Sequence, residues 1–151
     1  MNENTRNTLF SHKSDHWATP KKIYDFYMKK GAVDPTPLHC EEDNLEKDFG
    51  DVHLYINPPY SNISAWVDYA LEHCEKYRRR VVMLLVPSRT DTKWFQKLLT
   101  HKDYDVNFAF FKGRLKFGDS NASAPFPSVL IGITYGWGNK AISSVTLDDF
   151  E

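Results

Sequence analysis

The sequence predicts an α/β fold with a mostly parallel sheet, and three observations support this prediction. Strand-like apolar runs alternate with helix-like stretches, an order typical of right-handed βαβ units. The stretch RRRVVMLLVP, residues 78–87, ends in a continuous apolar run, as expected for a strand in the middle of a parallel sheet. The chain has 151 residues, of which 41% are hydrophobic and 15% aromatic, enough for one domain with a sizeable core.

The first parts of the chain are a polar arm and a helix. Residues 1–14 are expected to form a flexible N-terminal arm, followed by a single domain over residues 15–151. A helix is expected over residues 19–31, where Thr19 can cap the first turn and Pro20 suits the first helical position. The glycine that closes this stretch is typical of a helix stop.

Strands and helices then alternate to residue 137. Strands are expected at residues 32–38, 52–57, 78–87, 106–113 and 128–137, and helices at residues 63–77 and 90–101. The last two strands are close enough in sequence to pair, so the mostly parallel sheet is expected to end in an antiparallel hairpin. Ligands of such sheets bind beyond the carboxyl ends of strands, which puts Asp34, Asn57 and Pro87 on one rim.

Composition limits the classes of function. With a formal net charge of −1, a nucleic-acid partner would have to be held by a local basic patch. Two cysteines, no secretory signal and no apolar run near the roughly 20 residues that span a bilayer predict a cytoplasmic protein, in the host cell if it is viral. The six histidines lack metal-ligand spacing, so no metal is expected.

The stretch YINPPYSN, residues 55–62, places an amide, two prolines and an aromatic ring directly after an apolar strand. A stiff turn would explain it, because Asn and Pro favour turns. The alternative is a pocket for an amino group on a flat ring. The side-chain carbonyl of Asn57 and the main-chain carbonyl of Pro58 can accept the two hydrogens of such an amine, and the ring of Tyr60 offers a face for a base swung out of its stack. The position after a strand in an α/β pattern favours the pocket.

Several separated segments resemble the phage-type DNA N6-adenine methyltransferases, the small Dam-like enzymes of phages and prophages. The segments are HWATP (16–20), VDPTP (33–37), INPPYSNISAWVDYA (56–70), LLVPSRTDTKWF (84–95), GRLKF (113–117) and APFPS (124–128). NPPY alone also occurs in enzymes that methylate RNA or protein glutamine. The last three segments in this order are more specific to the phage group.

The resemblance implies a Rossmann-like methyltransferase, a three-layer sandwich that uses S-adenosylmethionine to methylate the N6 amine of adenine in DNA. It implies Asn57, Pro58, Pro59 and Tyr60 as the catalytic loop. Two departures concern the cofactor half: the usual Gly-rich loop is absent, and the stretch between Asp34 and the catalytic loop is too short for two full βα units. A trimmed sheet is therefore expected.

Most residues that suit S-adenosylmethionine lie in the first third of the chain. Asp34 suits the amino group of the cofactor, and the N-terminus of the first helix suits its carboxylate. Asp48 and Phe49 resemble the acidic and aromatic pair that holds adenine in related enzymes. The candidate ligands are Trp17, Thr19, Pro20, Asp34, Pro35, Asp48, Phe49 and Asn57, with Glu41 or Glu42 for the ribose. A turn role for Asp34, core packing for Trp17 and a solvated acidic loop are the structural alternatives.

Basic residues that suit DNA lie in the second half. Arg89 falls just past a strand end, on the rim of the catalytic loop. Arg114 and Lys116, two apart on an extended segment, point the same way and can neutralise phosphates. Phe117 can stack on a flipped base opposite the tyrosine of the catalytic loop. No inserted recognition domain is evident, so short loops such as residues 118–126 are expected to read the target.

The leading hypothesis is therefore transfer of a methyl group from S-adenosylmethionine to N6 of adenine in DNA. A methyltransferase acting on RNA is a second hypothesis, and a catalytically silent viral module that binds the cofactor or DNA is a third, from a different class. The intact catalytic loop favours turnover, whereas the short cofactor half favours the silent module. The sequence leaves open the target sequence, the strand preference, the oligomeric state and the biological role.

Overall fold

The computed structural model describes residues 16–38, 44–117 and 123–151. The predicted arm, Glu41 and Glu42 lie outside these ranges. The helices are α3 (Lys21–Lys29), α4 (Ile63–Lys76) and α5 (Lys93–Thr100), with 3-10 turns η1 (Asn44–Glu46), η2 (Tyr60–Asn62) and η3 (Leu147–Asp149). The strands are β1 (Leu54–Ile56), β2 (Val82–Pro87), β3 (Tyr104–Phe111), β4 (Ser128–Tyr135) and β5 (Lys140–Val145).

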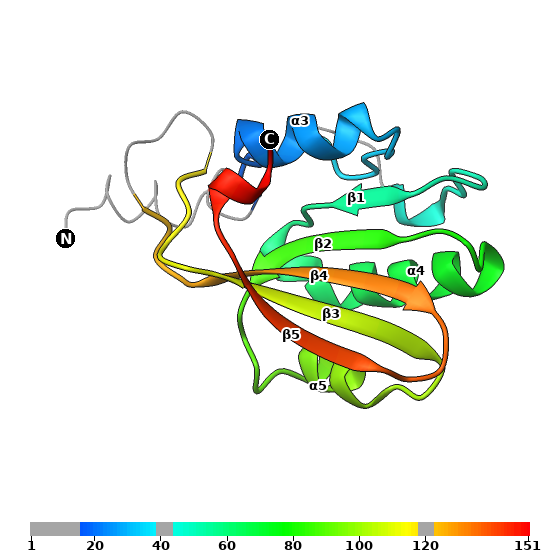
Figure 1. Ribbon diagram of the computed structural model, residues 1–151. Helices are drawn as coiled ribbons and strands as arrows, with labels where there is room; N and C mark the ends of the chain where they lie inside the picture. The colour runs from blue at the N-terminus through cyan, green and yellow to red at the C-terminus, as the bar shows by residue number, and fades with distance from the viewer. Residues whose placement is uncertain (1–15, 39–43, 118–122) are drawn as a thin grey trace.

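The structure has a mixed sheet, so the predicted mostly parallel sheet is confirmed only in part: β1, β2, β3 and β5 run in one direction and β4 runs in the other. Its five strands have the order β1-β2-β4-β3-β5 (Figure 1). β1 pairs with β2 and β3 pairs with β5 in parallel, whereas β4 is antiparallel to both of its neighbours, β2 and β3. The predicted hairpin of β3 and β4 is confirmed. It does not end the sheet as expected, because β5 pairs with the outer side of β3 and forms the edge.

A fifth strand that the sequence analysis missed forms one edge of the sheet. β5 has the sequence KAISSV, and most of its residues are exposed, including Ile142 with 73% of its surface accessible. A strand at an edge has only one neighbour, and since most side chains of β5 face solvent, it needs no apolar run. The periodicity that reveals a buried strand is therefore absent from this segment.

The two faces of the sheet pack against different helices, which gives three layers. α4 and α5 cover one face, and α3 with the C-terminal turn η3 covers part of the other (Figure 1). Successive side chains of β1 show the alternation: Leu54 and Ile56 belong to the α4–α5 core, whereas Tyr55 belongs to the α3 core. On that second face Phe150 packs edge-on against Phe26, with ring centroids 5.4 Å apart. The residues of the C-terminal turn thus help α3 to cover this face of the sheet.

The start of α3 differs from the prediction. Pro20 occupies the position before the first helical residue, and no side chain caps the helix, so the predicted capping by Thr19 is wrong. The hydroxyl of Thr19 is bonded elsewhere, as described below. The end of the helix is as predicted, because Gly31 has φ +82° and donates its N–H to the carbonyl of Met28 at 3.1 Å.

The predicted strand at residues 32–38 is reduced to a single parallel bridge between Val33 and Leu54. The N–H of Val33 donates to the carbonyl of His53, and the N–H of Tyr55 donates to the carbonyl of Val33, both at 2.9 Å. Val33, β1 and β2 therefore run side by side in the same direction. Their carboxyl ends, which are followed by Asp34, Asn57 and Ser88, lie along the same rim of the sheet, where the parallel strands end.

Candidate active site

Asn57 lies at the edge where β1 ends, and it is almost completely enclosed, with 3% of its surface exposed. Its main-chain N–H donates to the hydroxyl of Thr36 at 3.1 Å, and the ring of His16 donates to its main-chain carbonyl at 2.9 Å. Its side-chain NH2 group donates to the main-chain carbonyl of Trp17 and, at 3.1 Å, to the hydroxyl of Thr19. The side chain is therefore held by the segment that precedes α3.

The NH2 end of the Asn57 amide has two partners, whereas its oxygen has none among the described residues. Asn57 Oδ1 is buried and has no hydrogen-bond partner among the described residues. Buried polar atoms are nearly always paired, and leaving one unpaired costs about 1–3 kcal/mol. An acceptor left in this state is suited to an incoming N–H donor.

A cavity of about 320 Å³ opens beside this amide. Its lining includes the carboxylate of Asp34, hydroxyl groups, aromatic rings and Asn57 itself. The described lining residues are His16, Trp17, Ala18, Thr19, Tyr24, Asp34, Thr36, Pro37, Leu38 and Asn57. Four residues predicted to bind the cofactor, Trp17, Thr19, Asp34 and Asn57, thus surround one cavity, and Pro20 and Pro35 are their neighbours in the chain.

Asp34 supplies negative charge to this cavity. Its Oδ1 accepts a hydrogen bond from the N–H of Thr36 at 2.8 Å and another from the hydroxyl of Thr36 at 3.1 Å. Burial raises the pKa of Asp34 above its usual value, and the two bonds from Thr36 and the nearby His16 oppose this shift. A carboxylate that is desolvated in this way gains from an ammonium partner, because a nearby opposite charge favours its ionised form.

Aromatic rings gather beside Tyr60 and connect it to Trp17. The ring of Phe126 lies edge-on to Tyr60 with centroids 5.2 Å apart, and it also contacts Trp17 at 5.9 Å and Phe117 at 6.0 Å. Phe117, predicted to stack on a flipped base, is only 4% exposed and is packed between rings. Phe126 is the ring that reaches Tyr60, and it is only partly buried.

Several buried hydroxyls on the same rim also lack partners within the described ranges: those of Tyr60, Ser88 and Ser128. They follow β1, follow β2 and begin the antiparallel β4, so all three lie at one edge of the sheet. Burial raises the pKa of the Tyr60 hydroxyl, and the positive charge of Arg89 offsets part of this shift. The rim therefore concentrates polar groups that no described side chain or main-chain group satisfies.

The predicted basic residues are exposed near this rim. Arg89 follows β2 and is exposed. Arg114 and Lys116 are both exposed, whereas Leu115 and Phe117 between and beside them are buried, which agrees with an extended segment that shows alternate side chains to solvent. One guanidinium N–H of Arg114 donates to the carbonyl of Ala124 at 3.5 Å, which links it to the segment that carries Phe126.

Comparison with known families gives a match over most of the chain. The family described as DNA N-6-adenine-methyltransferase (Dam) matches residues 6–129. The chain belongs to the DNA N-6-adenine-methyltransferase (Dam) family. The protein is therefore a methyltransferase that uses S-adenosylmethionine to methylate N6 of adenine in DNA. Comparisons with curated proteins and with solved structures find no match.

The described residues of the methyltransferase were also compared with the requirements of a metal site and of a membrane-spanning helix. In the part of the chain that the structure describes, no three His, Cys, Asp or Glu side chains come together in a way that could hold a metal ion. Within the same ranges, no helix has the length and apolar character needed to cross a membrane.

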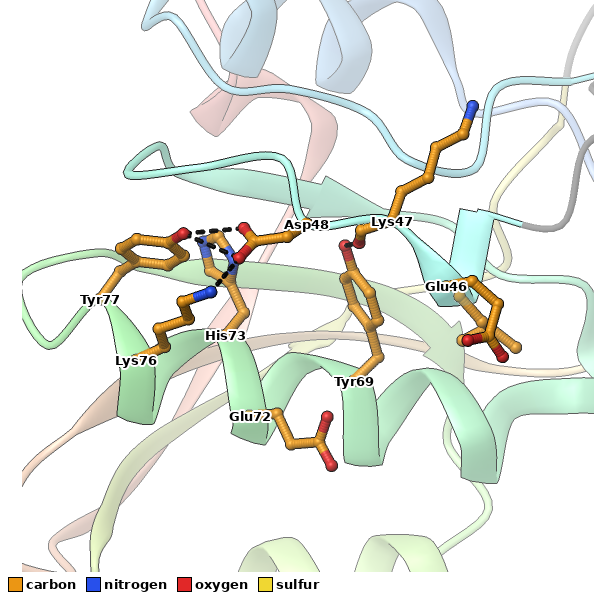
Figure 2. A pocket seen from close by; sticks show the side chains of 9 residues that line it. Glu46, Lys47, Asp48, Tyr69, Glu72, His73, Lys76 and Tyr77 are labelled. Atoms are coloured by element: carbon orange, nitrogen blue, oxygen red, sulfur yellow. Dashed lines mark hydrogen bonds and ion pairs between the residues drawn. The ribbon is translucent and has the colours of Figure 1, made fainter.

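The methyltransferase places Asp48 and Phe49 apart from the Asn57 cavity. Asp48 lines a different cavity of about 230 Å³ between the segment around η1 and α4 (Figure 2). Its carboxylate accepts from the ammonium of Lys76, from the hydroxyl of Tyr77 at 2.8 Å and from the N–H of Gly50 at 2.8 Å. These groups, Lys76 foremost, hold the pKa of Asp48 well below its usual value. Phe49 packs against the α4–α5 core.

Sequence reasoning gave no role to His16, Thr36, Tyr55 or Phe126, although the structure brings all four to the site of the methyltransferase. Each lies in or beside a segment on which the resemblance rests, so the segments were found but the roles were not. Their roles depend on contacts between segments that are far apart in the chain, such as His16 with Asn57, which are 41 residues apart. Local periodicity carries no information on such contacts.

Proposed function

We propose that the loop Asn57-Pro58-Pro59-Tyr60 holds the target adenine amine and that the adjacent cavity takes the methyl donor. The observation that carries this proposal is Asn57 Oδ1, a buried acceptor without a partner in the described structure. The NH2 end of the same amide is committed to Trp17 and Thr19, so the oxygen faces the other way. This arrangement suits a substrate that brings an N–H group to the rim.

The chemistry follows from the two carbonyl groups of the loop. The lone pair of an aryl amine is delocalised into its ring, so the nitrogen is a poor nucleophile. Acceptance of its two hydrogens by Asn57 Oδ1 and by the main-chain carbonyl of Pro58 favours a pyramidal nitrogen with a localised lone pair. S-adenosylmethionine, when bound, supplies an electrophilic methyl group on a sulfonium centre. No strong base is needed on the protein, because the amine becomes acidic once it is alkylated.

The cavity beside Asn57 fits the amino-acid end of the donor. Asp34 offers a carboxylate for the ammonium group, and burial raises the free energy of that carboxylate while it has no cationic partner. The N-terminus of α3, after Trp17, Thr19 and Pro20, offers the positive end of a helix for the donor's carboxylate. Pro35 has no N–H of its own, so the main-chain hydrogen bond that Asp34 accepts comes from Thr36.

Asp48 and Phe49 receive the least support among the predicted donor-binding residues. The carboxylate of Asp48 already has three partners, and it lines the other cavity. Its assignment to the adenine of the donor stays a prediction, and a substitution that tests it is given in the Discussion.

DNA approaches the same rim in this proposal. Arg89, Arg114 and Lys116 are exposed and can each bind phosphate, and the ring of Phe126 beside Tyr60 forms one wall for the flipped adenine. Residues 15–151 act as one domain, a trimmed variant of the Rossmann-like methyltransferase sandwich. The match of one family to residues 6–129 supports this reading of the domain.

Methyl transfer from labelled S-adenosylmethionine to adenine-containing DNA, followed by mass spectrometry of the nucleosides, tests the proposal. The expected product is N6-methyladenine, and it should disappear when Asn57 is replaced by Ala. Transfer that survives this substitution would move the catalytic amide to another residue. Equal transfer to RNA and DNA would remove the assigned preference for DNA.

A further inference from the structure

We infer that Thr19 is a positioning residue for methyl transfer: its hydroxyl and the main-chain carbonyl of Trp17 fix which end of the Asn57 amide faces the substrate. The inference rests on the proposed role of Asn57 as acceptor for the adenine amine. It gives Thr19 a role different from the binding of the methyl donor, for which its place beside α3 first made it a candidate.

An asparagine side chain presents two ends of nearly equal size and opposite hydrogen-bonding character. Reversal of the amide would turn an acceptor into a donor and would abolish its value to an amine. The carbonyl of Trp17 can only accept a hydrogen bond, so the NH2 end of Asn57 must face it. Thr19 Oγ1, 3.1 Å from Nδ2, takes the second N–H, so both hydrogens of the amide are engaged.

The hydroxyl of Thr19 is itself held from the sheet. Its oxygen lies 3.1 Å from the hydroxyl of Tyr55, which is completely buried and stacks on Tyr27 with centroids 5.2 Å apart. Tyr55 and Asn57 are two residues apart at the end of β1 and the loop that follows it, on the face that the segment before α3 covers. Thr19 thus joins the catalytic asparagine to a ring fixed in the core.

The start of α3 gives a second, independent indication. The sequence predicts that Thr19 caps the first turn of α3 with its side chain, a role common for Thr at a helix N-terminus, but Pro20 takes the capping position. Here no side chain caps α3, and the Thr19 hydroxyl is directed to Asn57 and Tyr55 instead. The local preference of this residue has been overridden by a contact 38 residues away in sequence.

The test compares Thr19→Val, which keeps the shape and removes the hydroxyl, with Thr19→Ser, which keeps the hydroxyl. Thr100→Val is the matched control, because Thr100 is exposed at the end of α5 and its hydroxyl donates to the carbonyl of Gln96 in the same helix. Each variant is assayed for single-turnover methyl transfer to DNA with donor and DNA saturating, and for the Kd of the donor by calorimetry. The melting temperature of each variant reports its folding.

We expect Thr19→Val to transfer methyl groups roughly tenfold more slowly, the factor that loss of one hydrogen bond typically gives. Donor Kd should change less than the rate, and Thr19→Ser should restore most of the rate. An unchanged rate in Thr19→Val would overturn the inference. So would a donor Kd that rises by the same factor while the saturated rate is kept, because Thr19 would then be a ligand of the donor.

Asn57→Asp provides a second variant. A carboxylate at this position would set an oxygen against the carbonyl of Trp17, so we expect a loss of roughly 100-fold in the single-turnover rate. A variant that keeps the wild-type rate would show that the Trp17 carbonyl does not select the orientation, which contradicts the inference.

Side-chain amide NMR separates a failure of this inference from a failure of the proposed function. The two NH2 protons of Asn57, assigned by their absence in Asn57→Ala, should exchange slowly with water in the wild type and in Thr19→Ser, and faster in Thr19→Val. This result is expected even if the wild type transfers no methyl group. Equal exchange in Thr19→Val and the wild type would overturn the positioning role whatever the activity.

Discussion

Two cavities of the methyltransferase, the one beside Asn57 and the one beside α4, each contain an aspartate, and these aspartates are in opposite states. Asp34, beside Asn57, is partly desolvated, and burial raises its pKa. Asp48, beside α4, is bonded to Lys76, Tyr77 and Gly50, which lower its pKa (Figure 2). The first carboxylate is costly to keep ionised without a cationic ligand, whereas the second is already neutralised by the protein.

The polar atoms around each aspartate follow the same division. Around Asp48, Tyr69 donates to the carbonyl of Lys47 at 2.6 Å and His73 bonds the carbonyl of Val52 at 2.7 Å, so α4 fastens the segment that follows η1. At the rim, buried oxygens of Asn57 and Tyr60 have no partner among the described residues. The comparison teaches that satisfied polar groups mark a structural contact and that unsatisfied ones mark a place for a ligand.

The largest expected effect comes from Asn57→Ala. Removal of the acceptor should lower the rate of methyl transfer by about 100- to 1,000-fold, the loss typical of a deleted transition-state hydrogen bond. Donor affinity should be nearly unchanged, and single-turnover assays with calorimetry measure both quantities. A loss of donor affinity as large as the loss of rate would contradict the catalytic role.

Asp34→Asn should weaken donor binding by roughly 10- to 100-fold, because a charge-assisted contact to the ammonium group is lost. Its effect on stability should have the opposite sign. The folded-state pKa of Asp34 is raised, so ionisation destabilises the fold as pH rises from the unfolded pKa through the folded one. The free energy of unfolding of the variant should therefore be equal or higher at about pH 7, with a smaller decline from about pH 4.

Urea denaturation at both pH values measures the stability of the Asp34→Asn variant, and calorimetry measures its donor affinity. A variant that loses stability at neutral pH while it binds the donor normally would assign Asp34 a structural role. The contrast between the two aspartates would then fail.

A moderate effect on DNA binding is expected when one positive charge is removed near the rim, and none when one is removed at the opposite end of the strands. Arg114→Ala should weaken DNA binding several-fold and reduce the slope of log K against log salt by about 0.9, the value for one phosphate contact. Arg79→Ala is the matched control, since Arg79 is exposed after α4, away from the rim. Equal slopes for the two variants, measured by fluorescence anisotropy, would exclude Arg114 from the DNA interface.

The smallest effect should come from Asp48→Asn. If Asp48 only fastens its segment to α4, the variant should melt at a slightly lower temperature and bind the donor as the wild type does. Exposed ion pairs of this kind contribute little. A clear fall in donor affinity would restore the role in adenine binding that the family resemblance implied, and it would place the donor across both cavities.

Sequence reasoning located the apolar elements of the fold well, because burial leaves a periodic trace. The helix α4 and the continuous apolar run of β2 were both predicted within a few residues of their observed bounds. The edge strand β5 left no such trace. The strand order could not be predicted either. A hairpin of β3 and β4 can join the sheet with β3 or with β4 next to β2, and in the structure it is β4.

The candidate site was predictable in part. The chemistry of Asn57 could be reasoned from its loop, and the groups that S-adenosylmethionine requires pointed to Trp17, Thr19 and Asp34, which the fold brings around one cavity. The orientation of the Asn57 amide could not be reasoned, because it depends on a main-chain carbonyl of a distant segment. The hydroxyl of Thr19 followed the distant contact rather than its local preference, which only the folded structure reveals.

The insertion of β4 between β2 and β3 has a consequence for how the chain is made. During synthesis β2 and β3 leave the ribosome before β4, yet neither can join the other until residues 128–135 arrive. Until then β2 can pair only with β1, and β3 lacks its neighbour β4, a partly formed sheet that is prone to aggregate. The sheet can therefore be completed only after β4 has been made. An mRNA truncated before the codon for Ser128 would yield a chain without the central strand.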